Sequence, residues 1–216
     1  MAPTTIVGID LSGPANAADT ALIIGHATAE SLELYESRLG VSDTSILALA
    51  RKLAAGPAVL ALDAPLSYNE GGGDRPSDRH LRRKIIDAGM ASGSVMSPTM
   101  TRMAYLTLRG IAVARGIQSV AGPTVRIVEV HPGATMALRG APIEAVRGFA
   151  KQPEARTELL RWLGTQGIGG LDPTLAQTSH QIAAVAAALA GWSWEQGRSV
   201  WSWKAAPPLH PFDFAC

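Results

Sequence analysis

The chain has 216 residues, of which 47% are hydrophobic and 17% charged, a composition that excludes intrinsic disorder and indicates a globular protein. Its formal net charge of +1 excludes a strongly basic nucleic-acid binder of the histone or ribosomal kind, but not an enzyme with a local basic strip. The only cysteine, Cys216, excludes a disulfide within the chain. We therefore expect one cytoplasmic domain over residues 1–216. The longest apolar run, 182–190, is too short to cross a membrane, so no membrane partner is expected.

Three short segments near the N-terminus predict an antiparallel meander of strands, at residues 4–10, 20–26 and 31–39. A helix is predicted over 42–55, because Ser42 or Asp43 can cap it and its apolar residues recur at helical spacing. Residues 58–63 then predict a buried strand that ends in an acid.

The middle of the chain is predicted to be mainly helical. A glycine-rich loop at 71–76 precedes a helix over 77–88. Ser97 followed by proline is a typical helix start, so a second helix is predicted over 98–115, with Gly116 just past its end.

A third buried strand is predicted at 124–131, and the Pro-Gly pair at 132–133 is expected to stop it. The region 134–169 is predicted to be helical and rich in surface residues. A capping box that begins at Thr178 predicts an alanine-rich helix to about Glu195.

Three predicted strands carry an acid at or near the carboxyl end: Asp10, Asp63 and Glu129. If these strands are parallel neighbours, the acids meet at one edge of the sheet, where ligands bind in open α/β sheets. Grouped carboxylates repel each other and are costly to bury, and a hard divalent cation compensates for both effects. The pattern predicts a Mg²⁺ or Mn²⁺ site. The alternative is that each acid only caps a turn.

Basic and polar residues follow the predicted strands and could hold a phosphate group. Arg79, Arg82 and Arg83 share one face of the predicted helix, with Arg75 close by. The predicted phosphate- or substrate-binding residues are Ser12, Arg75, Arg79, Arg82, Arg83 and His131. The alternative for the arginines is a solvated face paired with neighbouring acids.

Two histidines are candidates for direct roles, although a lone histidine is more often structural than catalytic. His131 lies two residues after Glu129 on the same predicted strand face, which makes it a candidate metal ligand or support. His180 lies at a predicted helix N-terminus, a position that disfavours its charged form and suits a neutral base or ligand.

Several motifs occur together in the order found in a known family: 7–13, 62–67, 75–83, 109–110, 129–134 and the last alanine-rich helix. On these motifs, over nearly its whole length, the chain resembles a domain-of-unknown-function family described as predicted nucleases of ribonuclease H-like fold. The resemblance implies an α/β fold with a mixed five-stranded sheet, three antiparallel strands followed by two parallel ones, flanked by helices. It also implies a divalent-metal site of Asp10, Asp63 and Glu129.

The last helix departs from that family's pattern. The family tends to have an Asp-His pair there and a second Asp one turn later, whereas this chain has Ser179, His180 and Ala183. Asp172, in the preceding loop, is the nearest substitute carboxylate. One fewer charge is expected to weaken a second metal first.

The leading hypothesis is a metal-dependent nuclease that hydrolyses phosphodiester bonds in nucleic acid, with Asp10, Asp63, Glu129 and His180 as catalytic residues. One alternative is a non-catalytic ribonuclease H-like binding protein that has lost its last-helix acid. Another is a small phosphotransferase of the actin and sugar-kinase type, because residues 10–13 look like the phosphate loop of that fold. Two tryptophan pairs near the C-terminus are interpreted as packing or as a self-association surface of a homo-oligomer.

Overall fold

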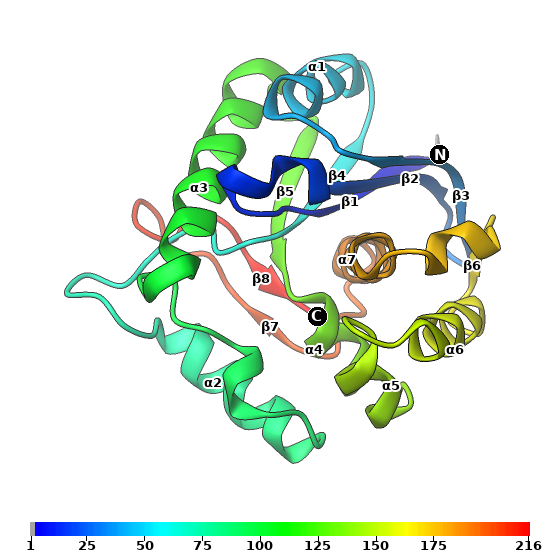
Figure 1. The fold of residues 1–216 in the computed structure, drawn as a ribbon. Helices are drawn as coiled ribbons and strands as arrows, with labels where there is room; N and C mark the ends of the chain where they lie inside the picture. The colour runs from blue at the N-terminus through cyan, green and yellow to red at the C-terminus, as the bar shows by residue number, and fades with distance from the viewer. Residues whose placement is uncertain (1–2) are drawn as a thin grey trace.

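A computed structural model describes residues 3–216, and in these residues eight strands form one sheet with helices on both faces (Figure 1). The strand order is β6-β3-β2-β1-β4-β5-β8-β7. The strands are β1 (Thr4–Asp10), β2 (Ala21–Ala27), β3 (Leu32–Leu39), β4 (Ala58–Asp63), β5 (Val125–Val130), β6 (Ile168–Gly169), β7 (Ser202–Trp203) and β8 (Phe214–Ala215).

The centre of the sheet confirms the predicted ribonuclease H-like arrangement. Strands β1, β2 and β3 pair antiparallel, and β4 and β5 continue from β1 in parallel. The predicted number of five strands is wrong, because β6 extends the β3 edge and β8 and β7 extend the β5 edge. These three strands have only two residues each, too few to produce a recognisable alternation of polar and apolar residues.

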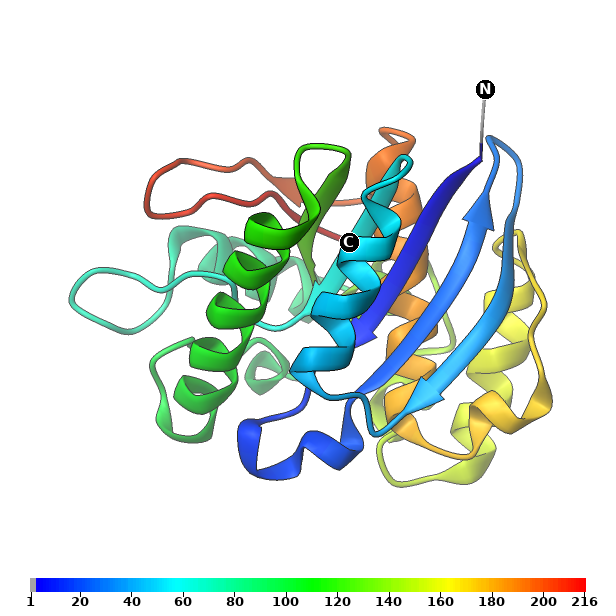
Figure 2. The same ribbon diagram turned by 90° about the horizontal axis from the view of Figure 1, so that it is seen from above.

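The helices lie in two layers around this sheet (Figure 2). The α-helices are α1 (Asp43–Leu53), α2 (Pro76–Asp87), α3 (Thr101–Ala121), α4 (Pro132–Leu138), α5 (Ile143–Gly148), α6 (Pro153–Gly164) and α7 (Ser179–Glu195). Short 3₁₀ helices are η1 (Pro14–Asp19), η2 (Ser92–Ser94) and η3 (Pro173–Ala176). One core lies between the sheet and α1 with α3, and the other between the sheet and α7. No helix in residues 3–216 combines the length and apolar character needed to cross a membrane.

Helix α7 packs directly on β1 because Gly8 has no side chain. A Cβ atom at Gly8 would lie 2.1 Å from the carbonyl oxygen of Ala184 and 2.4 Å from the amide nitrogen of Ala188. The alanine-rich sequence of α7 therefore brings the helix close enough to bury its whole middle section against the strand.

We expect Gly8→Ala to lower the free energy of unfolding by about 1–3 kcal/mol, because the added methyl group would press on the rigid backbone of a helix. Urea denaturation measures the loss. The matched control is Gly13→Ala, since a Cβ atom at Gly13 would have no atom within 4 Å. Equal unfolding midpoints for the two variants would contradict the predicted close contact.

Helix α3 corrects the prediction for residues 98–115. It begins at Thr101, passes through Gly116 and ends at Ala121, where Gly122 follows with φ of 68°. Gly116 is inside the helix because it faces α1: a Cβ atom there would lie 2.8 Å from Cδ2 of Leu47. A glycine needed for close packing was therefore mistaken for a helix end.

The Pro-Gly pair at 132–133 does end β5, but it also begins α4, whereas the sequence predicted helical structure only from residue 134. Proline fits the first turn of a helix, and the side chain of His131 accepts a hydrogen bond from the backbone amide of Ala134. Strand and helix are thus joined without an intervening loop.

Candidate metal centre

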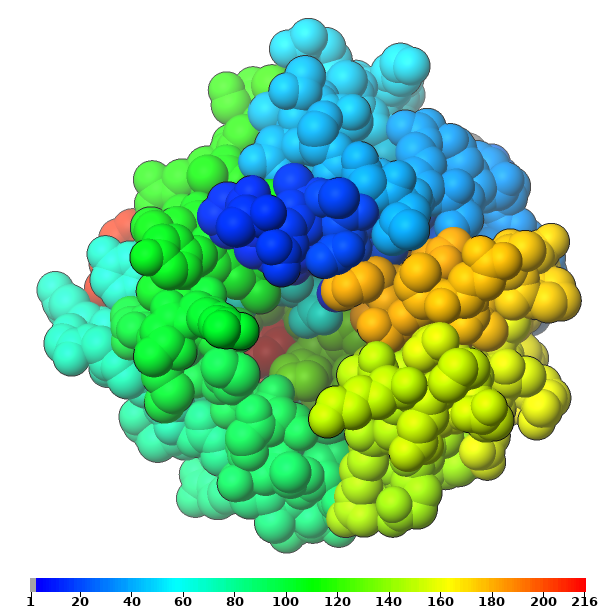
Figure 3. All heavy atoms as spheres, in the orientation of Figure 1, coloured from blue at the N-terminus to red at the C-terminus, as the bar shows by residue number. Residues whose placement is uncertain are grey.

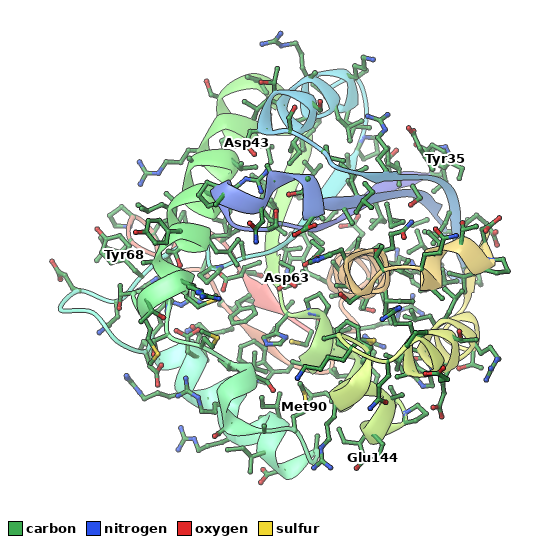
Figure 4. All side chains as sticks on the ribbon, in the orientation of Figure 1. Tyr35, Asp43, Asp63, Tyr68, Met90 and Glu144 are labelled. Atoms are coloured by element: carbon green, nitrogen blue, oxygen red, sulfur yellow. The ribbon has the colours of Figure 1, made fainter. Side chains whose placement is uncertain are left out.

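The carboxyl ends of β1 and β4 place two acids side by side. These strands are parallel, and Asp10 and Asp63 are register partners. Figure 4 shows Asp63 near the centre of the molecule, between α3 and α7. Burial, followed by the negative charge of Asp10, raises the pKa of Asp63 well above its usual range. The two carboxylates form a site where negative charge is poorly compensated by the protein.

Glu129, the third predicted acid, also reaches this edge of the sheet but has a partner of its own. Its Oε2 accepts hydrogen bonds from Nη1 of Arg75 at 2.8 Å and from the amide of Leu66 at 2.9 Å. Its Oε1 lies 2.5 Å from Nη2 of Arg75. Within residues 3–216, no three or more His, Cys, Asp and Glu side chains are grouped to hold a metal ion. The geometry therefore singles out the Asp10–Asp63 pair.

Arg75 is a buried counter-ion, with 3% of its surface exposed. Besides Glu129 it contacts Asp78, whose Oδ1 lies 2.7 Å from Nη2. The backbone amide of Arg75 donates to Oδ2 of Asp78 at 2.8 Å, so the same carboxylate also caps the N-terminus of α2. Through these bonds, the positive charge of the guanidinium balances the two buried carboxylates of Asp78 and Glu129. Arg75 also lines a small cavity next to Asp10 and Asp63.

His180 joins the carboxylate pair from the first turn of α7. Its Nδ1 lies 2.6 Å from Oδ2 of Asp10. This hydrogen bond raises the pKa of His180 despite partial burial. The direction is opposite to the one predicted from the helix terminus, because the nearby carboxylate outweighs the helix dipole.

His131 lines the same region but has both ring nitrogens engaged. Nδ1 accepts from the amide of Ala134 at 3.2 Å, so Nε2 carries the proton and donates to the carbonyl of Ser94 at 2.8 Å. Burial lowers the pKa of His131. The ring therefore holds the loop that contains η2 against the start of α4.

The predicted basic face of α2 turns towards a loop instead of the carboxylates. Arg82 pairs with Asp74 and donates to the carbonyl of Val95 at 2.7 Å, while Arg79 donates to the carbonyl of Asp74 at 2.8 Å. Arg83 is exposed. None of these three arginines lines either cavity beside Asp10 and Asp63.

The Arg82–Asp74 pair gives a pH-dependent stability. Hydrogen bonding from Arg82 is the main cause that lowers the pKa of Asp74 to about 2. Because the folded protein binds this proton less tightly than the unfolded chain, the stabilisation is complete above about pH 4 and disappears as pH falls towards 2. We expect Asp74→Asn to cost about 1–2 kcal/mol at pH 7 and almost nothing near pH 2. Thermal unfolding of both proteins at the two pH values measures this difference in stability. A difference between the wild-type protein and Asp74→Asn that does not change with pH would contradict the prediction.

Ser12 and Arg109 tie the loop after β1 to neighbouring elements. Arg109 donates to the carbonyl of Ser12 at 2.7 Å and to Oδ1 of Asp43 at 2.7 Å, and Oγ of Ser12 donates to the carbonyl of Asn16 at 2.6 Å. Sequence reasoning gave Arg109 no role. Arg109 lies on the same face of α3 as the buried Val113, and this spacing could have indicated that its side chain is buried.

A cavity of about 690 Å³ opens beside the carboxylate pair, and Asp10, Asp63 and His180 line it. Figure 3 shows this hollow between η1, the start of α7 and α5. Ala183 also lines the cavity, whereas Asp172 is exposed and caps η3 through the amide of Thr174 at 2.8 Å. Asp172 therefore does not replace the acid that α7 lacks.

Comparison with known proteins gave three findings. A family model described as "Protein of unknown function (DUF429)" matches residues 8–206. No curated protein matches the chain significantly. Among solved structures, a chain from "T. thermophilus RuvC in complex with Holliday junction substrate" is 13% identical, with a TM-score of 0.41 over 90% of this chain and 97% of that chain.

Proposed function

The chain belongs to the DUF429 family of unknown function, and we propose that it is a divalent-metal-dependent hydrolase of phosphodiester bonds in nucleic acid. The observation that carries this proposal is the Asp10–Asp63 pair, which lies at the carboxyl edge of parallel strands and beside an open cavity. Catalytic sites in open α/β sheets occupy this edge.

The donor set fits one Mg²⁺ or Mn²⁺ ion. Magnesium typically binds one or two protein carboxylates and takes its other ligands from water and substrate phosphate oxygens. The pKa of Asp63 is raised by burial and then by repulsion from Asp10, and a cation would compensate the negative charge that both disfavour. Asp10 and Asp63 would hold the ion, and Glu129 would add negative charge that Arg75 largely balances. Such an ion supplies charge stabilisation to the phosphoryl group and lowers the pKa of a bound water.

His180 has two roles in this proposal. Its Nδ1–H donates to Asp10 and fixes the orientation of that carboxylate. With Nδ1 protonated, the neutral ring has its free lone pair on Nε2, which can accept a proton from the attacking water. A His with a side chain 38% exposed at the cavity can return that proton to solvent.

A second candidate is a non-catalytic binding protein, and Ala183 favours it. This residue lines the cavity one turn after His180, where a carboxylate would complete a richer set of metal ligands. The phosphotransferase alternative has less support, because the Ser12 hydroxyl and the loop around it are bonded internally to Asn16, Thr20 and Arg109.

A cleavage assay separates these candidates. We expect the purified protein with Mn²⁺ to cleave at least one of three labelled substrates: single-stranded, double-stranded or branched nucleic acid. Asp10→Asn should lower the rate at least about 10³-fold, since the metal and the transition-state charge both depend on this carboxylate. Asp87→Asn, an exposed acid at the end of α2, is the matched control and should cleave normally. Calorimetric Mn²⁺ binding without cleavage of any substrate would instead support the binding protein.

A further inference from the structure

The walls of the larger cavity are mainly apolar, although the carboxylate pair lies at one side of it. Four different elements or their connections supply these walls, and Figure 4 shows Met90 on the side towards α2. The apolar lining residues are Met90, Ala91, Pro132, Val146, Phe149 and Ala183. A site that only held a metal and a phosphate would have no use for this surface, because both are polar.

The volume and the chemistry of the cavity suit a flat heterocycle. Ligand sites of small molecules typically enclose about 300–1,000 Å³, and this cavity has about 690 Å³. The ring of Phe149 and the thioether of Met90 are groups that pack well against aromatic faces. The second cavity at the carboxylates, about 240 Å³, falls below that range.

Arg147 adds a positioned polar group to this cavity. Its Nη1 lies 2.6 Å from Oε1 of Glu144, and its Nη2 donates to the carbonyl of Gly89. The bond to Gly89 connects α5 with the turn that follows α2. The Arg147 side chain is 49% exposed and these two hydrogen bonds hold the plane of its guanidinium, so the group can stack on a base or donate to its edge.

Resting on the proposed function, we propose that this cavity is a nucleobase pocket. A base would lie between Met90, Phe149 and Arg147, and the phosphate attached to its sugar would lie at Asp10 and Asp63. Because a paired and stacked base cannot enter such a cavity, the substrate would be single-stranded nucleic acid or a nucleotide flipped out of a duplex. The proposed pocket therefore limits the substrate class to nucleic acid with an unpaired base.

Calorimetric titration with small probes tests the pocket in the presence of Mn²⁺. We expect adenosine and cytidine 5′-monophosphates to bind at least about tenfold more tightly than ribose 5-phosphate, which has no base. Phe149→Leu keeps apolar packing but removes the ring, and should reduce this ratio severalfold. Phe212→Leu, at another partly buried phenylalanine outside the cavity, is the matched control and should keep the ratio. Equal binding of all three probes to the wild-type protein, or no binding of the nucleotides, would overturn the proposal.

The pocket and the nuclease function can fail separately. Base-dependent binding that is lost in Phe149→Leu, together with no cleavage of any nucleic acid, supports the pocket and contradicts the hydrolase. Cleavage that is equally fast at an abasic site and at a normal nucleotide in single-stranded DNA overturns the pocket and leaves the hydrolase in place.

Discussion

Asp63→Asn is expected to lower Mn²⁺-dependent cleavage at least about 10³-fold and at the same time to stabilise the metal-free protein. Activity falls because one of the two carboxylates that would hold the ion is lost. Stability rises because the ionised Asp63 is enclosed beside Asp10, and both burial and repulsion disfavour its charge. An amide of nearly the same shape removes that penalty.

The pH dependence follows from the same shift. A carboxyl group with a raised pKa in the folded state binds its proton more tightly there than in the unfolded chain. The wild-type protein therefore loses stability as pH rises from about 4 through the raised pKa, and the variant does not. At neutral pH the difference should be on the order of 1 kcal/mol or more.

Denaturation in EDTA and again in Mn²⁺ measures both effects. The metal should stabilise the wild-type protein but not Asp63→Asn, so the advantage of the variant should shrink or reverse. Asp87→Asn should behave like the wild-type protein in both buffers. A variant that is less stable in EDTA than the wild-type protein would contradict the like-charge pair.

Arg75→Met is expected to lower the free energy of unfolding by about 3–5 kcal/mol, because it leaves buried carboxylates without their counter-ion. Asp78 and Glu129, with 2% and 4% of their surfaces exposed, both depend on this guanidinium. Methionine retains much of the apolar volume, so the loss reports charge rather than packing.

A second substitution separates charge from shape in this buried pair. Adding Glu129→Gln to Arg75→Met removes one orphaned charge and should recover a large part of the lost stability. Arg83→Met, at an exposed position of the same helix, is the control and should cost less than about 0.5 kcal/mol. Equal losses at Arg75 and Arg83 would mean that the buried network contributes little.

The same variant addresses whether Glu129 contributes to a metal site. If it does, Mn²⁺ should stabilise Arg75→Met more than the wild-type protein, because the freed carboxylate gains a cation in place of the arginine. A smaller or equal effect would leave the ion to Asp10 and Asp63 alone.

The sequence predicted the position of Asp10 and Asp63 because parallel strands bring their carboxyl ends to one edge, and strand patterns are local. The start of α7 was predicted for the same reason: Thr178 caps its own helix through the amide of Gln181 at 3.1 Å. Partners that are distant in sequence were not predictable. Arg75 is 54 residues from Glu129, and no local pattern indicates that a helix-cap arginine turns inward to meet it.

The cavity walls were also beyond sequence reasoning. Met90 and Phe149 belong to irregular or short segments whose spacing predicts no common face, and they line one cavity because α5 contacts the turn after α2 at Gly89. Arg82 was assigned to phosphate on its charge and helical spacing, whereas the Arg82–Asp74 pair confirms the alternative interpretation, in which this arginine face pairs with neighbouring acids.

The contact between Asp10 and His180 joins side chains 170 residues apart, from the first strand and the last long helix. During translation, the first strand leaves the ribosome long before the helix that covers it and completes its carboxylate site. A nascent chain that stops before Ser179 has therefore neither the histidine nor the cover over Gly8. If the chain has the proposed function, hydrolytic activity should consequently arise only after α7 has been synthesised and has packed on β1.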